Sequence, residues 1–193
     1  MLGPTGVGVL YGRKNLLEQL APFAFGGGMV ADTDTSKMCG RVPSLETSAW
    51  QEVPYKFEAG TPNFEGVLGL GAAIKYLNAF GMEKIHAHER NLTAYALKVL
   101  GDISGLEIYG PKTAKNKCGV VSFNLKDVHS HDMATIMARA NIVVRAGHHC
   151  AIPLMKKLCV DSSCRASFYI YNTRRDVDAL VKAILDAKKI FKV

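Results

Sequence analysis

A cysteine that ends a run of basic side chains is the feature of this sequence best suited to chemistry. Cys150 follows Arg145, Gly147, His148 and His149. A predicted strand ends at Arg145, Gly147 permits a sharp turn, and nearby positive charge favours the nucleophilic thiolate. The alternatives are a buried, inert cysteine or a metal site. We expect no metal, because adjacent residues rarely converge on one ion and the usual ligand spacings are absent.

Two further segments are suited to binding an anion. Arg165, in the segment 164–167, precedes an apolar strand, where its guanidinium suits a carboxylate or a phosphate, or a plain surface ion pair. Thr61, in the segment 57–63, lies ahead of a predicted helix, where a hydroxyl and free backbone amides also suit an anion. Equally, Thr61 or Asn63 could simply cap that helix.

Helices and short strands must position these residues. Apolar spacing and end signals predict helices over 14–20, 63–81, 83–100, 132–140 and 173–191, the last with a capping box at Thr173–Asp176. Apolar and β-branched runs predict strands over 7–11, 107–109, 119–125, 142–145 and 166–171. The polar stretch 31–48 lacks helical periodicity and predicts an excursion, such as a hairpin.

This alternation predicts an α/β or α+β sandwich, in which helices cover a sheet. A change of pattern near 78–83 predicts two parts, 1–80 and 81–193. The 193 residues are 48% hydrophobic and 21% charged, which excludes a disordered chain. The apolar runs are too short to cross a bilayer, and no signal peptide is recognisable, so we expect no membrane association.

The charge balance is basic, with 24 Lys and Arg against 17 Asp and Glu. The positive residues are scattered and not interleaved with aromatic ones, so we expect acidic small molecules or an acidic protein as partners, and no nucleic acid. The odd count of five cysteines, without paired spacing, favours a reducing compartment.

Five segments resemble a known family when they are taken together and in order. They are residues 2–8 (LGPTGVG), 26–29 (GGGM), 57–63 (FEAGTPN), 145–150 (RAGHHC) and 164–167 (CRAS). In register, they resemble the C-terminal half of a SUF-type cysteine desulfurase of the class V aminotransferases. The resemblance implies the fold of pyridoxal-phosphate transferases of fold type I. The chain would then hold the last strand of the large domain and a small α/β domain.

The resemblance also implies a reaction and roles for particular residues. Such enzymes use pyridoxal 5′-phosphate to take sulfur from L-cysteine, which leaves L-alanine. Cys150 matches the residue that keeps the sulfur as a persulfide. Arg165 matches the residue that holds the substrate carboxylate, and Arg145, His148 and His149 match residues around the substrate.

The remaining implications concern the cofactor and the partners. Thr61, with Gly60, matches the loop that reaches the cofactor phosphate of the neighbouring subunit in the family's homodimer. The excursion 31–48 matches a hairpin near the dimer and partner surface. The sulfur would pass to an acceptor protein for iron–sulfur cluster assembly. We expect a cytoplasmic protein, unless a targeting segment preceded Met1.

One departure from the family pattern is a missing lysine. The family's Schiff-base lysine lies just ahead of the segment that resembles residues 1–6, and Lys14 lies too far along the chain to replace it. We therefore expect a catalytically incomplete portion of an enzyme, with no turnover alone. Two alternatives are a non-catalytic module that binds a sulfur acceptor or a full-length desulfurase, and a selenocysteine lyase.

Overall fold

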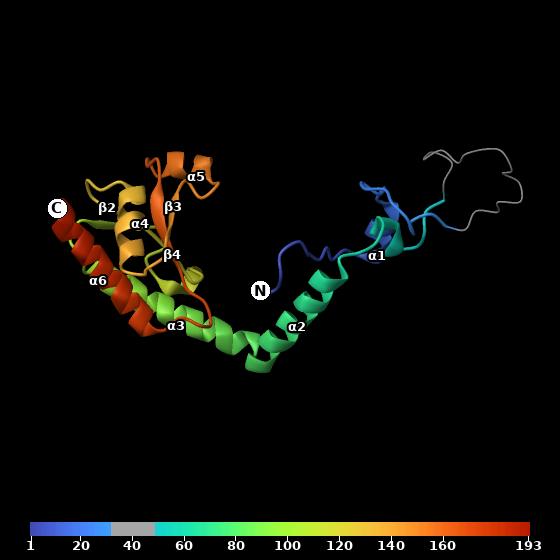
Figure 1. Ribbon diagram of the computed structural model, residues 1–193, viewed down its shortest axis with the longest axis horizontal. Helices are drawn as coiled ribbons and strands as arrows, with labels where there is room; N and C mark the ends of the chain where they lie inside the picture. The colour runs from blue at the N-terminus through green and yellow to red at the C-terminus, as the bar shows by residue number, and fades with distance from the viewer. Residues whose placement is uncertain (32–48) are drawn as a thin grey trace, which may run out of the picture. The chain divides into compact units, whose positions relative to one another are not determined.

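The computed structural model describes residues 1–31 and 49–193 and divides the chain into two compact units (Figure 1). Unit 1 comprises Met1–Ala79, and unit 2 comprises Phe80–Val193. Apart from Ala31, the predicted excursion 31–48 lies outside the described residues. In the described part of the chain, no helix has the length and apolar character needed to traverse a bilayer.

Unit 1 is built on one long helix and short local structure. Helix α1 spans Lys14–Gln19, the 3-10 turn η2 spans Tyr55–Phe57, and α2 spans Phe64–Phe80. Both predicted helices are therefore confirmed. An isolated antiparallel bridge joins Val30 to Trp50 next to the buried Met29.

The predicted strand over residues 7–11 is wrong. This segment forms no strand in the structure, and Val9, Leu10 and Tyr11 are 81%, 80% and 90% exposed. The β-branched composition favours extended backbone, but a strand also needs a neighbour to accept and donate its hydrogen bonds. Within residues 1–31 and 49–193, no strand pairs with this segment.

Unit 2, all of whose residues are described, contains an antiparallel sheet. Its strands are β1 (Leu106–Tyr109), β2 (Val120–Leu125), β3 (Arg145–Gly147) and β4 (Ser163–Ser167). The order across the sheet is β1-β2-β4-β3, and all neighbours are antiparallel. The sequence locates β1 and β2 well but misplaces the other two strands. Their pairing register, with Ser167 opposite Val120 and Ser163 opposite Gly147, decides where they begin and end.

Three helices cover one face of this sheet (Figure 1). They are α3 (Met82–Gly101), α4 (Ser130–Arg139) and α6 (Arg174–Phe191). All three match predicted helices, and the predicted capping box opens α6. The predicted sandwich of helices over a sheet is therefore confirmed.

The core of unit 2 lies between these helices and the sheet. Strand β2 alternates, with Val121, Phe123 and Leu125 in the core, and Cys164 and Ala166 of β4 join them. Since successive side chains of a strand point to opposite faces, the residues between these ones lie on the other face of the sheet. We call that second surface the open face.

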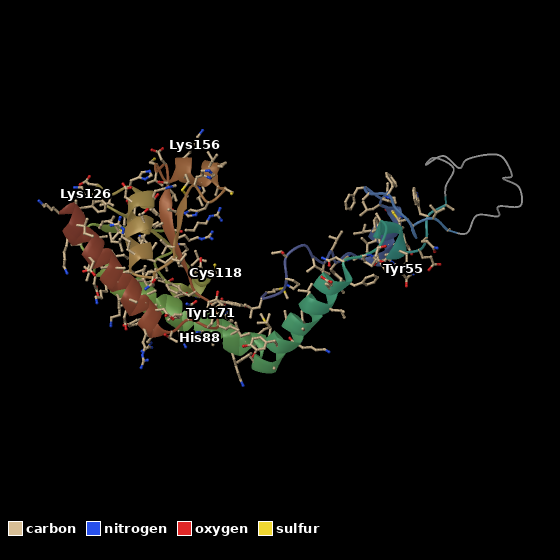
Figure 2. The ribbon with its side chains drawn as sticks, viewed as in Figure 1. Tyr55, His88, Cys118, Lys126, Lys156 and Tyr171 are labelled. Atoms are coloured by element: carbon tan, nitrogen blue, oxygen red, sulfur yellow. The ribbon has the colours of Figure 1, made fainter. Side chains whose placement is uncertain are left out.

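A short helix that the sequence did not predict adjoins the open face. Helix α5 spans Ile152–Lys157 and follows Cys150 directly, with Pro153 in its first turn, where proline is well tolerated. Lys156 projects from α5 in Figure 2. A 3-10 turn, η3, spans Ala114–Asn116 and precedes β2.

Candidate functional site

A row of polar side chains crosses the open face of the sheet. The strand registers place Tyr109 opposite Ser122, Ser122 opposite Arg165, and Arg165 opposite Arg145. Residues directly opposite each other in an antiparallel pair share a face, and their Cβ atoms lie about 4.5–5.5 Å apart. Arg165, predicted to bind an anion, and Arg145, expected near the substrate, are therefore brought together by β3 and β4.

Neither arginine has an acidic partner among residues 1–31 and 49–193. No ion pair in the described residues involves Arg145 or Arg165, and the Nε atom of Arg165 is buried without a hydrogen-bond partner there. Two like charges directly opposite each other destabilise a sheet. An anion that bridges or neutralises them would remove this cost, so the arrangement suits a carboxylate or a similar group.

Cys150 lies beside one of these guanidinium groups. Its thiol is exposed, and Nη2 of Arg145 lies 3.5 Å from Sγ of Cys150. The backbone N–H of Cys150 donates to Nδ1 of His148 over 3.1 Å, so the His148 ring holds the turn locally. This geometry places a cation where negative charge would develop on the sulfur, which is what a nucleophilic cysteine requires.

The loop that carries Cys150 has a strained backbone. The φ angles of His149 and Cys150 are 56° and 57°. For residues other than glycine, this left-handed conformation costs about 1–2 kcal/mol each. Consecutive strained residues persist only where surrounding contacts hold them, and such residues cluster at functional sites.

His149 supplies one of these contacts. Its Nε2 atom lies 2.9 Å from the carbonyl oxygen of Ser163 and 3.0 Å from the Ser163 hydroxyl. Burial, together with the charges of Arg165, Arg145 and His148, lowers the pKa of His149, although its bond to Ser163 acts in the opposite direction. The half-buried ring is thus engaged with β4.

A cavity of about 470 Å³ separates the sheet from α5. Its polar lining includes Arg165, His149, Ser122 and Lys117, and its apolar lining comes mainly from α5. Lys117 was not singled out from the sequence. Its Nζ donates to the carbonyl oxygens of Tyr109 and Pro111, and burial is the main cause that lowers its pKa.

The other described cysteines differ from Cys150. Cys164 is buried, its Sγ donates to the carbonyl oxygen of Ser130, and burial raises its pKa to about 12. Cys118 and Cys159 are exposed, but no hydrogen bond joins either thiol to a guanidinium in the described part of the chain. Cys150 is therefore the described thiol best placed to act as a nucleophile.

The loop predicted to contact the cofactor lies in unit 1. It had two candidate roles, anion binding and capping of α2, and the structure assigns the cap to one residue. Oδ1 of Asn63 accepts from the backbone N–H of Gly66 over 2.9 Å, so Asn63 caps α2 and Thr61 does not. Thr61 is exposed. Gly60 adopts a φ of +79°, and its N–H donates to Gly27 over 3.0 Å. Gly60 thus shapes the turn, and the hydroxyl of Thr61 remains accessible.

The fold and the site together define a small α/β domain that presents an exposed cysteine beside two arginines for which no acidic partner lies among the described residues. The family model described as "Aminotransferase class-V" matches residues 1–180. The chain belongs to this family.

The sequence is similar to curated proteins named probable cysteine desulfurase. It is 49% identical over 191 residues to the one from Staphylococcus epidermidis and 48% identical over 191 residues to the one from Halalkalibacterium halodurans. Each alignment covers 99% of this chain but 44% of the relative. The chain therefore spans less than half the length of these relatives.

The structure is similar to solved cysteine desulfurases. The enzyme from Thermococcus onnurineus superposes with a TM-score of 0.87 and the Escherichia coli enzyme CsdA with 0.84, both at 38% identity. Each match covers 97% of this chain and 44% of the other. The expected fold, a C-terminal part of a fold-type-I transferase, is thereby confirmed.

Proposed function

We propose that this chain is the C-terminal portion of a pyridoxal-phosphate-dependent cysteine desulfurase, and that it carries the sulfur-accepting cysteine. The observation that carries the proposal is the placement of Cys150 Sγ 3.5 Å from the Arg145 guanidinium, while Arg145 itself lies opposite Arg165. The similarity to named cysteine desulfurases supports the same conclusion.

Three residues of this chain would have distinct roles in the reaction. Arg165, which lacks an acidic partner in the described residues, would bind the carboxylate of L-cysteine. The Cys150 thiolate would attack the substrate sulfur, so that a sulfur–sulfur bond forms as the carbon–sulfur bond breaks. The bonding electrons stay on the substrate carbon, which takes up a proton and becomes the methyl group of L-alanine. Arg145 would stabilise the charge on the attacking sulfur.

The residues of unit 1 fit one end of the cofactor that the family uses. Thr61 presents an accessible hydroxyl ahead of α2, beside the turn formed by Gly60, and would bind the phosphate of pyridoxal phosphate in a neighbouring subunit of a homodimer. When bound, the cofactor supplies the electron sink that makes the substrate bond breakable.

Three of the described lysines are already engaged by other groups and do not fit the covalent end of the cofactor. Lys14 pairs with Glu18 at 3.7 Å, and Lys56 is buried and donates to the Glu18 carbonyl oxygen. Lys117 is held by two carbonyl oxygens. We therefore expect the chain alone to release no alanine from L-cysteine when pyridoxal phosphate is added.

The proposal extends to partners and compartment. The persulfide on Cys150 would pass to an acceptor protein that serves iron–sulfur cluster assembly, which the exposure of this thiol permits. All described cysteines are free thiols, which supports a reducing compartment such as the cytoplasm.

A chimaera tests the proposed function. This chain replaces the matching 44% of the S. epidermidis relative, to which it is 49% identical. After incubation with pyridoxal phosphate and L-cysteine, mass spectrometry should find an additional sulfur atom on Cys150, together with released alanine. The same assay with selenocysteine in place of L-cysteine compares alanine release from the two substrates.

Two variants, each lacking one exposed thiol, test whether Cys150 carries the sulfur. Cys150→Ala should carry no persulfide, whereas Cys118→Ala, which removes another exposed thiol, should behave like the unmodified chimaera. A folded chimaera that binds the cofactor but gains no sulfur on Cys150, while the intact relative does gain sulfur, would refute the proposal and favour a non-catalytic module.

A further inference from the structure

His149 ties the Cys150 loop to the strand that carries Arg165. Its Nε2 atom contacts both the carbonyl oxygen and the hydroxyl of Ser163, at 2.9 Å and 3.0 Å. Ser163 is fully buried, and alternation along β4 places it on the same face as Arg165. The residue next to Cys150 is thus attached to the strand on which the substrate carboxylate would bind.

The two contacts select one tautomer of the imidazole. A carbonyl oxygen can only accept, so Nε2 of His149 carries the proton and donates it to Ser163. Nδ1 is buried, and no partner for it lies among the described residues. The opposite tautomer would bury an unpaired N–H at Nδ1 and turn a lone pair of Nε2 toward the carbonyl oxygen, both of which are unfavourable.

The strained backbone of the loop requires contacts that hold it, and this bond is one of them. His149 and Cys150 both have left-handed φ angles, which neither residue type prefers. The contact between His148 and Cys150 lies within the loop and cannot fix it to the sheet. The bond from His149 to Ser163 joins the loop to β4 one residue before Cys150, whose Sγ lies 3.5 Å from Nη2 of Arg145.

We propose that His149 is a positioning residue, whose bond to Ser163 holds the Cys150 thiol beside the Arg145 guanidinium. This differs from the substrate contact expected from the sequence. The inference rests on the proposed function only in taking Cys150 as the nucleophile. The contacts it describes are made by residues of this chain alone.

Two amide substitutions of His149 in the full chain test whether its bond to Ser163 positions Cys150. The side-chain nitrogen of Gln occupies nearly the position of Nε2 of a histidine, whereas that of Asn occupies the position of Nδ1. Asn tolerates the left-handed backbone but cannot reach Ser163. We therefore expect His149→Gln to keep the bond to Ser163. We expect His149→Asn to lose this bond while still tolerating the left-handed backbone.

The readout is the rate at which iodoacetamide alkylates Cys150 at neutral pH, quantified by peptide mass spectrometry. We expect the rate to fall about fivefold or more in His149→Asn, the effect of losing one hydrogen bond, and to stay near the unmodified value in His149→Gln. The buried thiol of Cys164 should stay unalkylated in the same digests, which controls for global unfolding. Equal rates in all three chains, or equal losses in both variants, would overturn the inference.

A second measurement needs no variant. Nitrogen-15 NMR of the imidazole in the unmodified chain should show His149 protonated at Nε2 and unprotonated at Nδ1. Protonation at Nδ1 alone would contradict the inference. Neither measurement involves turnover, so a failed chimaera with a normal His149 result would reject the proposed function and leave the positioning role intact.

Discussion

Arg145 and Arg165 are direct cross-strand partners on the open face of the sheet, with no carboxylate paired to either one in the described residues. Two guanidinium groups in this relation repel each other. This repulsion lowers the stability of unit 2 when no anion is bound. A bound anion would offset it.

Removing one of these charges should therefore stabilise the chain. We expect Arg165→Met to raise the free energy of unfolding by about 0.5 kcal/mol, because it removes the repulsion and a buried Nε that lacks a partner. Urea denaturation measures the change. Arg139→Met, in the last turn of α4, is the control and should not stabilise, because a cation is favourable there. Destabilisation by Arg165→Met would contradict this account.

The buried thiol of Cys164 should make stability fall in alkali. Its pKa is about 12 in the folded chain, above the ordinary value of 9.0, so the unfolded chain ionises first. The stabilisation is fully present below pH 9 and is lost as the pH rises toward 12. At pH 10 the loss is about 1.4 kcal/mol.

Cys164→Ser isolates this effect, because serine does not ionise in that range and can donate to Ser130 as the thiol does. The difference in unfolding free energy between the two chains should shrink as the pH rises from 8 to 10. A difference that does not depend on pH would show that Cys164 does not control the alkaline slope.

The first turn of α6 should respond to loss of its acidic cap. Oδ2 of Asp176 accepts from the backbone N–H and the hydroxyl of Thr173, at 2.7 Å and 3.2 Å. We expect Asp176→Ala to lower the free energy of unfolding by about 1 kcal/mol in urea titrations. Asp186→Ala, in the later part of the same helix, removes an exposed pair with Lys189 and should change stability by less than about 0.5 kcal/mol. Equal effects of the two variants would argue against the cap.

Substitutions of Thr61 and Asn63 should have different effects, the first on cofactor binding and the second on thermal stability. In the chimaera, Thr61→Ala should weaken pyridoxal phosphate binding about tenfold without lowering the thermal midpoint, because the exposed side chain leaves the cap of α2 intact. Asn63→Ala should lower the thermal midpoint, because it removes bonds to Gly66 and Gly6. Unchanged cofactor affinity in Thr61→Ala would exclude a phosphate contact.

The local pattern of the sequence was enough for the helices other than α5. The apolar spacing of α2, α3 and α6 and the cap residues of α6 act within a few turns, so they can be recognised without the fold. The chemical character of the segment 145–150 is similarly local, because reactive residue types lie close together in the chain. The class of protein was implied by the resemblance of five such segments taken in order, and the segment 145–150 contains the residue expected to act as the nucleophile.

Other features depend on contacts between residues distant in sequence. The limits of β3 and β4 and the placement of Arg145 opposite Arg165 follow from strand register, which β-branched composition does not specify. The choice of Asn63 as the cap of α2 needed the positions of both side chains.

The role of the histidine next to Cys150 was likewise invisible in the sequence. The resemblance of the segment 145–150 to the family implied that His149 lies near the substrate. Only the folded chain brings Ser163 to its Nε2 atom, because β4 returns beside the loop after α5. Sequence thus determined which groups are present, and tertiary structure decided which of them face a ligand and which hold the others in place.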